Sequence, residues 1–319
     1  MNNYAVIVGH GRSGTNWLHK LFDLSEETYC RNEPHELSDS PISRFNYQRV
    51  IVRNDQEILI NDWDNTIKEV GCNMSYFDAW IKDKKNYFNS SKFIYICLRS
   101  NKIRNLLSFF SRELKKNEWA LPIQAVKTIE WEKARRIYKF VMSPGWSVFL
   151  LKNRKNVPVF HIVRHPGGFL NSWKNRYLLS KEKEDVYACN LKRLEDIAHE
   201  SDYWRNKFGD INQLDLNESE LWYWYYANET IFQAGKGKSQ YTLLSFEDLT
   251  KQPVKILNVL YQKTGLAVDD RIMKKVVMSS KNSRNIAGAW RESLAEKEIN
   301  QCEKFVQMAR NSFGTDLDN

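Results

Sequence analysis

The chain has 319 residues, of which 42% are hydrophobic, 13% aromatic and 27% charged. This composition excludes a disordered chain, and a domain of this size buries about 75% of the surface of its unfolded form. The formal net charge of +9 favours anionic partners, among them nucleic acids, membrane surfaces and polyphosphorylated small molecules.

The five cysteines are widely spaced and form no C-x-x-C pair, which predicts neither a disulfide framework nor a zinc site. No apolar run approaches the roughly 18 residues of a membrane span, and the apolar run at residues 4–8 is too short for a secretory signal. We therefore expect a cytoplasmic protein in a reducing compartment, with no bound metal and no stable membrane insertion.

Short runs rich in β-branched and aromatic residues alternate with longer helical patterns along the chain. The pattern predicts strands at residues 4–8, 28–32, 67–72, 92–98, 157–163 and 241–246. It predicts helices at residues 14–24, 103–115, 166–177, 219–234, 253–264 and 295–312. Several strands are continuously apolar, which is typical of strands buried on both faces. We therefore expect an α/β fold of the three-layer sandwich type, with a parallel central sheet between helices.

Two segments depart from this alternation. Residues 115–150 are rich in tryptophan and helical in pattern, and residues 179–217 are densely charged. A dense run of charges usually marks a solvated helix face, but a lid over a substrate pocket also fits residues 179–217. No boundary divides the chain. We therefore expect one domain over residues 1–319, with helical insertions on the acceptor side at about residues 115–150 and 179–217.

A glycine-rich turn at residues 9–14 joins the first predicted strand to the first helix. Backbone N–H groups in such a turn converge on an anion, and the helix N-terminus adds a partial positive charge. Gly9 and Gly14 match the spacing of the G-x-x-x-x-G-K-[ST] phosphate loop, but Thr15 and Asn16 follow them in place of its lysine and hydroxyl residue. A nucleoside triphosphatase needs that lysine, whereas a donor with one bridging phosphate does not. Here Arg12 supplies the cation.

A second basic pattern follows the predicted strand at residues 157–163. Arg164 leaves the carboxyl end of this strand, where ligands bind in open α/β sheets, and Pro166 opens the next helix. Ser172 lies about two turns along that helix, on nearly the same face as its start. This arrangement favours a second phosphate site.

Together these patterns resemble sulfotransferases that use 3′-phosphoadenosine-5′-phosphosulfate (PAPS). The string from Arg12 to Trp17, Arg-Ser-Gly-Thr-Asn-Trp, looks like the family's 5′-phosphosulfate loop, and Arg164 with Ser172 is similar to its 3′-phosphate motif. Residues 241–249 with Pro253 resemble the family's strand, acidic pair and helix. Residues 285–291 resemble its late Gly-x-Trp-Arg loop, which closes over the nucleotide.

The resemblance extends over residues 4–313 and implies the P-loop sulfotransferase fold, with PAPS as co-substrate and 3′-phosphoadenosine-5′-phosphate (PAP) as product. It implies that Trp290 stacks on adenine and that Arg291 reaches the 3′-phosphate. The donor-binding residues that it implies are Gly11, Arg12, Ser13, Gly14, Thr15, Asn16, Trp17, Arg164, Ser172, Trp290 and Arg291. A similar pattern begins at the predicted strand at residues 92–98, which is followed by Arg99 and by a predicted helix with Arg104 and Ser108. It remains an alternative 3′-phosphate site.

Sulfuryl transfer to an alcohol requires a base for the hydroxyl proton. Glu33 follows the predicted strand at residues 28–32, which places it at the sheet edge near Arg12. Its spacing from Arg12 resembles that of the catalytic glutamate in tyrosylprotein sulfotransferases. We therefore expect Glu33 to be the general base and Arg12 to stabilise the developing charge. His35 and Glu36 remain alternatives for the base.

The sequence leaves the acceptor and the oligomeric state open. Sugars, glycolipids, peptide tyrosines and small metabolites all fit as acceptors, and the aromatic run Trp222, Trp224, Tyr225 and Tyr226 either lines such a site or packs on the sheet. Two histidines have readable patterns. His161 alternates with apolar neighbours on a predicted strand, which is typical of a core residue. His10 lies in the glycine-rich turn, where it either donates a second hydrogen bond or has no specific role.

The sequence disfavours two other classes of protein. The missing lysine after Gly14 disfavours a nucleotide-dependent kinase. The absence of a zinc pattern and of a strongly basic segment disfavours a nucleic-acid-binding protein.

Overall fold

The computed structural model describes residues 3–36, 42, 48–50, 63, 67, 85–87, 127–177, 183–267 and 269–314. The predicted strand at residues 92–98 and the predicted helix at 103–115 lie outside the described residues, as does the strand at 67–72 apart from its first residue. The alternative phosphate site at Arg99, Arg104 and Ser108 lies outside them too. Within the described residues, no helix combines the length and apolar character needed to cross a membrane.

The described strands form one parallel sheet in the order β2-β3-β1-β4-β5. The strands are β1 (Tyr4–Gly9), β2 (Thr28–Asn32), β3 (Arg135–Val141), β4 (Val159–Val163) and β5 (Tyr241–Ser245). In the register of the sheet, Ile7 of β1 lies beside Lys139 of β3 and Phe160 of β4. The predicted parallel sheet is therefore confirmed.

Strand β3 corrects the prediction of a helical insertion at residues 115–150. The described part of that segment holds α5 (Thr128–Lys133), then β3, then the start of α6 (Pro144–Asn153). β3 lies between β2 and β1, inside the sheet. Its apolar run is interrupted by basic residues, and tryptophans lie in the flanking helices, so the local pattern did not indicate a strand.

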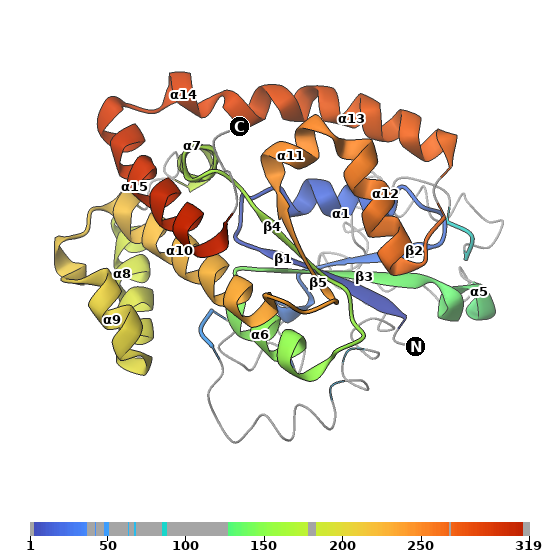
Figure 1. Cartoon of the computed structure of the whole chain (residues 1–319), viewed down its shortest axis with the longest axis horizontal. Helices are drawn as coiled ribbons and strands as arrows, with labels where there is room; N and C mark the ends of the chain where they lie inside the picture. Colours follow the sequence, from blue (N-terminus) through green and yellow to red (C-terminus); the bar gives the residue numbers. More distant parts are fainter. Residues whose placement is uncertain are drawn as a thin grey trace, which may run out of the picture.

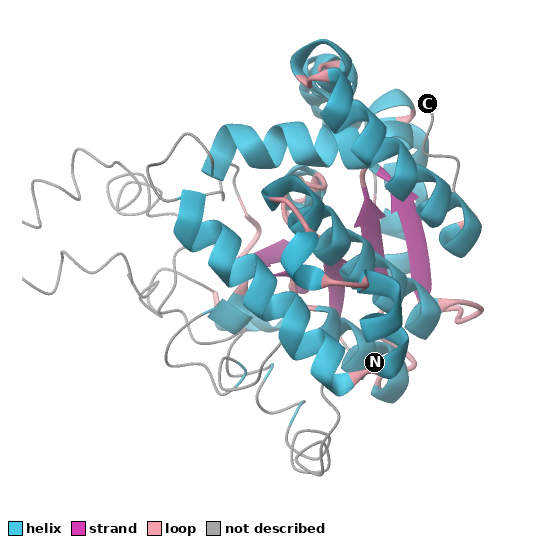
Figure 2. Cartoon of the chain, turned by 90° about the vertical axis from the view of Figure 1, so that its left-hand side faces the viewer, coloured by secondary structure: helices cyan, strands magenta, loops and turns pink. Residues whose placement is uncertain are grey.

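Helices cover both faces of the sheet (Figures 1 and 2), which confirms the three-layer architecture. One face carries α1 (Thr15–Asp23), α11 (Phe246–Lys251), α12 (Pro253–Thr264) and α13 (Asp270–Gly288). The other carries α6 and α10 (Leu216–Gly235). The remaining helices are α7 (Pro166–Tyr177), α8 (Lys183–Glu200), α9 (Asp202–Phe208), α14 (Trp290–Ser293) and α15 (Glu296–Phe313), with short 3-10 turns at Pro34–Glu36 and Ile211–Gln213.

Alternation along β1 explains why both faces are covered. Successive side chains of a strand point to opposite faces, so Ala5 and Ile7 pack with Phe22 of α1, while Val6 and Val8 pack with Trp146 of α6. Because both sets are apolar, the strand has to be buried on both sides. The glycine-rich loop that follows β1 is therefore held between two packed layers.

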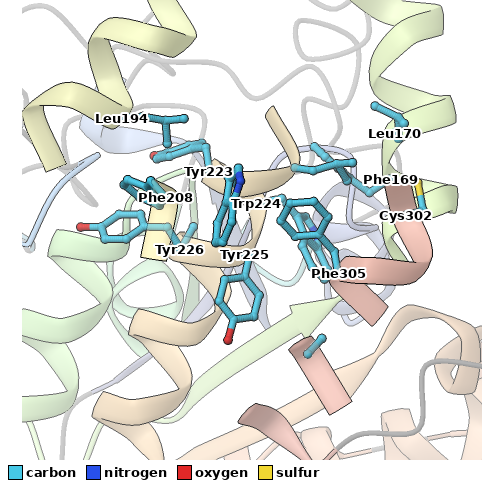
Figure 3. Close-up of a cluster of buried hydrophobic side chains, with 14 of the residues drawn as sticks. Phe169, Leu170, Leu194, Phe208, Tyr223, Trp224, Tyr225, Tyr226, Cys302 and Phe305 are labelled. Atoms are coloured by element: carbon cyan, nitrogen blue, oxygen red, sulfur yellow. The ribbon is translucent and has the colours of Figure 1, made fainter. Parts of the chain in front are cut away.

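The aromatic run on α10 belongs to the core. Trp222, Trp224, Tyr225 and Tyr226 are each at most 4% exposed, and Figure 3 shows the last three within a cluster of buried side chains that also includes Phe208 and Phe305. A capping box between Asp215 and Glu218 begins the helix. Packing, rather than an acceptor site, is thus the role of these aromatic side chains.

His161 of β4 is the buried, satisfied histidine that the sequence predicts. Its Nε2 donates to Asn228 Oδ1 over 2.9 Å, and its Nδ1 accepts from Tyr241 Oη over 2.8 Å. Burial lowers the pKa of His161 to about 4, so the ring is neutral at pH 7. The prediction is confirmed.

Candidate functional site

The glycine-rich loop, residues 10–14, connects β1 to α1 at the carboxyl end of the sheet (Figure 1). Gly14 precedes α1 with a φ of 91°, a left-handed conformation that favours glycine. It offers no side chain to cap the first turn of α1, which leaves backbone N–H groups available at that end of the helix. Arg12 also adopts a positive φ, 66°, which turns the loop sharply. Such a loop is suited to bind an anion.

We expect Gly14→Ala to destabilise the protein more than an alanine at another left-handed glycine does. A Cβ at Gly14 would lie 2.3 Å from Phe246, whereas one at Gly237, with a φ of 76°, would meet nothing within 4 Å. The collision adds about 1–3 kcal/mol to the backbone strain that both substitutions share. Urea unfolding of Gly14→Ala and Gly237→Ala tests this difference, and equal losses of unfolding free energy would contradict it.

Arg164 lies where the sequence predicts, at the carboxyl end of β4, and it is 4% exposed. Its Nη1 donates to the Arg12 carbonyl over 3.2 Å and its Nη2 to the Ile286 carbonyl over 3.0 Å. Burial lowers the pKa of Arg164 to about 10, while the carboxylate of Glu247 acts against that shift. The guanidinium therefore remains a cation at pH 7.

Ser172 completes a group of three residues from the two predicted phosphate motifs. Arg12 Nε donates to Ser172 Oγ over 3.0 Å, and Arg164 bonds to the backbone of Arg12. The motifs are far apart in the sequence but adjacent here, because β1 and β4 are neighbours and α7 begins directly after β4. The structure thus brings Arg12, Arg164 and Ser172 together.

Buried polar atoms of Ser13, which follows Arg12, and of Arg164 have no hydrogen-bond partner in the described part of the chain. They are Ser13 Oγ, in a side chain that is 0% exposed, and Arg164 Nε. Buried polar groups without partners are rare in folded proteins. One belongs to the glycine-rich loop and the other to the arginine after β4, so a ligand with two anionic groups would supply partners to both.

Glu247 holds the start of α7 in place. Its Oε1 accepts from the His165 backbone N–H over 3.2 Å, and its Oε2 accepts from Ser245 Oγ over 3.2 Å. The carboxylate also lies near Arg164. The sequence marked residues 241–249 only by their resemblance to a family pattern. The positioning role of Glu247 depends on β4 and β5 being neighbours.

The structure corrects the prediction of a loop at residues 285–291. These residues end α13 and begin α14, with a helical break at Ala289. Trp290 is 4% exposed and stacks on His165, with ring centroids 4.3 Å apart, while the Arg291 guanidinium lies 4.7 Å from its ring centroid. Trp290 therefore packs on the turn after Arg164, and its stacking on adenine stays a prediction.

Glu33 follows β2 and forms an ion pair with Lys139, with Oε1 and Nζ 2.7 Å apart. The sequence predicts Glu33 at the carboxyl end of a strand, near Arg12, but the structure inserts β3 between β2 and β1. The buried ammonium of Lys139 also donates to Oδ1 of Asn16 in the first turn of α1. Lys139 thus connects Glu33 to the helix that follows the glycine-rich loop.

Lys139 is the site residue that sequence reasoning missed. Its side chain is 1% exposed, within the run Ile137-Tyr-Lys-Phe-Val141. A lone lysine in a short apolar run is unusual, because a buried ammonium requires partners. This lone lysine was the signal in the sequence that could have identified the residue. It indicates a buried charge only once the run is known to be a strand.

The two alternatives to Glu33 differ in their surroundings. His35 is 0% exposed, stacks on Phe140 and bonds through Nε2 to the Val141 carbonyl over 3.1 Å. Burial lowers the pKa of His35 to about 4. Glu36 instead has its pKa raised to about 7, first by desolvation and then by the charge of Glu33, to which it is hydrogen-bonded. Glu36 therefore titrates near neutral pH.

Fold and site together define an α/β protein with a candidate anion site at the carboxyl edge of its parallel sheet. No family model matches the chain, and no curated protein matches it. Solved structures of sulfotransferases do resemble it.

The sulfotransferase domain of the Synechococcus PCC 7002 olefin synthase is 16% identical, with 95% of this chain and 94% of that one covered and a TM-score of 0.42. The sulfotransferase domain from the curacin biosynthetic pathway is 11% identical, with 95% and 96% covered and a TM-score of 0.47. Mouse sulfotransferase SULT7A1, solved with PAP, is 14% identical, with 97% and 85% covered and a TM-score of 0.42. At these identities the likeness concerns the fold alone.

Proposed function

We propose that the protein is a sulfotransferase that moves the sulfuryl group of PAPS to a hydroxyl group of an acceptor, either a sugar, a glycolipid or a small metabolite. The observation that carries the proposal is the convergence of Arg12, Arg164 and Ser172 at the carboxyl ends of β1 and β4. PAPS carries phosphate at both its 5′ and 3′ positions, so its binding needs two basic groups with hydroxyls close by.

The residues present fit this donor. The glycine-rich loop, with Ser13, Arg12 and the N-terminus of α1, would bind the 5′-phosphosulfate. Arg164 and Ser172 would bind the 3′-phosphate, with Trp290 and Arg291 next to the nucleotide. Ser13 Oγ and Arg164 Nε, which have no partner among the described residues, lie in these two groups and support the assignment.

In the proposed reaction, the acceptor oxygen attacks sulfur in line with the bridging oxygen of the 5′-phosphosulfate. The new sulfur–oxygen bond forms while the bond to the bridging oxygen breaks, and that oxygen leaves with the electron pair as part of PAP. Glu33 accepts the hydroxyl proton. Arg12 and the N-terminus of α1 stabilise the charge on the leaving oxygen, so the mechanism needs no metal.

The raised pKa of Glu36 predicts how turnover depends on pH. Below about pH 7 Glu36 is protonated and donates a hydrogen bond to the carboxylate of Glu33. This hydrogen bond makes Glu33, the proposed base, less able to accept a proton from the acceptor hydroxyl. Above that pH, Glu36 loses its proton and Glu33 is released. We expect kcat to rise between pH 6 and 8, and Glu36→Gln, which cannot titrate, to remove this rise. A pH profile of kcat for both proteins tests the coupling, and identical profiles would contradict it.

Binding of PAP is the direct test of the donor assignment. We expect PAP, without any metal, to raise the melting temperature, and ATP with Mg²⁺ to raise it much less. Binding of a ligand to the folded state alone stabilises it by about 2.7 kcal/mol at 100 times its Kd. Stabilisation by ATP that depends on Mg²⁺, with none by PAP, would instead support a nucleotide-dependent kinase.

We also propose that residues 1–319 form one domain and that the protein is located in the cytoplasm. The described cysteines Cys189 and Cys302 are free thiols, which is compatible with a reducing compartment.

A further inference from the structure

A cavity of about 310 Å³ opens beside Arg12. Its walls come from the glycine-rich loop, from the residue that follows β3, and from α7, α8 and the start of α10. Met142, Trp173 and Val186 form apolar parts of the wall. The volume is at the lower end of the range for small-molecule sites, about 300–1,000 Å³, which favours a small ligand.

The cavity has a buried polar side formed by His10 and Glu220. The two side chains are 1% and 2% exposed, and His10 Nε2 lies 3.6 Å from Glu220 Oε1. Glu220 Oε2 lies 3.7 Å from Arg193 Nη1, and the Arg193 guanidinium lies 4.2 Å from the centroid of the Tyr223 ring. Burial raises the pKa of Glu220, and the nearby guanidinium of Arg193 acts against that shift.

His10 presents a hydrogen-bond acceptor without a partner. Its Nδ1 donates to the Gly11 carbonyl over 3.1 Å, which leaves Nε2 as the unprotonated nitrogen. A distance of 3.6 Å to Glu220 is too long for a hydrogen bond, and Nε2 is a buried atom with no partner among the described residues. Burial lowers the pKa of His10 to about 3, so the ring stays neutral at pH 7. Nε2 and the Glu220 carboxylate therefore both favour a ligand group that donates hydrogen bonds.

We propose that this cavity is the acceptor site and that its substrates are small, uncharged ring compounds with two hydroxyl groups. One hydroxyl would lie beside Arg12, where sulfuryl transfer would take place, and the other would share its single proton between His10 Nε2 and Glu220 Oε1, which lie 3.6 Å apart. His10 and Arg12 both line this cavity, so one small ring in it would contact both residues. The proposal rests on the proposed function, because it assigns the acceptor to the same site.

Phenol and the benzenediols catechol, resorcinol and hydroquinone are suitable probes, since they differ in the second hydroxyl. We expect the best diol to have a kcat/KM about 10- to 100-fold above that of phenol with PAPS as donor, as one hydrogen bond to a charged or buried group accounts for this factor. Glu220→Gln and, independently, His10→Phe should reduce the ratio of kcat/KM for the best diol to kcat/KM for phenol to about 1. Glu195→Gln, the same change at an exposed position of α8, should keep the ratio.

Cys189 provides a second measurement that needs no turnover. It is an exposed free thiol of α8 and lines the cavity, so a bound diol should slow its alkylation by iodoacetamide. Peptide mass spectrometry follows the labelling of Cys189, and Cys189→Ser identifies the peptide. We expect the best diol to protect at a concentration about 10-fold lower than phenol does, and Glu220→Gln to remove this difference. Retention of the PAP-induced thermal shift shows that Glu220→Gln is folded.

The two measurements separate the failure of this proposal from that of the proposed function. Selective protection by diols, lost in Glu220→Gln, with neither sulfuryl transfer to any probe nor a thermal shift with PAP, would support the diol pocket while rejecting the proposed sulfotransferase activity. PAP binding together with equal protection by phenol and the diols would reject the diol pocket alone. Absence of both turnover and protection for every diol would also overturn it.

Discussion

Replacing Arg164 with alanine is expected to weaken PAP binding by about 100-fold or more. The guanidinium is the buried cation proposed to bind the 3′-phosphate, and its Nε lacks a partner among the described residues. One hydrogen bond to a charged group contributes about 1.5–3 kcal/mol, and a bidentate contact contributes more. Isothermal titration with PAP measures the loss, and Arg205→Ala, which removes an exposed arginine of α9, is the matched control.

Loss of Arg164 also removes two hydrogen bonds within the protein, to the carbonyls of Arg12 and Ile286. We expect the unliganded variant to unfold at a lower urea concentration, by about 1–3 kcal/mol in unfolding free energy. Arg164→Lys keeps the charge but cannot reach both carbonyls and the phosphate, so its affinity for PAP should be intermediate. If Arg164→Ala bound PAP as tightly as the unaltered protein, the 3′-phosphate assignment would be wrong.

Replacing Glu33 with glutamine is expected to lower kcat by about 10²- to 10⁴-fold and to leave PAP affinity within a few-fold of its starting value. The amide cannot accept the proton of the acceptor hydroxyl, and such general-base contributions are typically of this size. Single-turnover kinetics with PAPS and titration with PAP measure the two effects separately.

Glu27→Gln is the matched control for this substitution. Glu27 is an exposed glutamate at the opposite end of β2 from Glu33, so the same chemical change there should alter neither kcat nor affinity. A larger loss of kcat in Glu36→Gln than in Glu33→Gln would transfer the role of base to Glu36. Loss of PAP binding in Glu33→Gln, together with loss of turnover alone in Arg164→Ala, would contradict both assignments.

The elements that the sequence predicted well are those with local signals. The predicted helix at residues 166–177 coincides with α7, and that at 253–264 coincides with α12, because a proline begins each and fixes the backbone for a first turn. The glycine-rich loop was recognised from the spacing of Gly9 and Gly14 between an apolar strand and a helical pattern, and the structure explains Gly14 by its left-handed backbone. Such constraints act within a few residues, so the sequence displays them directly.

The sequence by itself therefore determined the glycine-rich loop, Arg164 and Ser172 after β4, and the alternation of strands and helices. Tertiary structure decided the insertion of β3 between β1 and β2, the pairing of Lys139 with Glu33, and the approach of Glu220 to His10 at the wall of the cavity beside Arg12. The physical reason is that strand order and the pairing of buried charges depend on contacts between distant residues. The role of a buried lysine or glutamate can be assigned only when the fold shows which partner lies next to it.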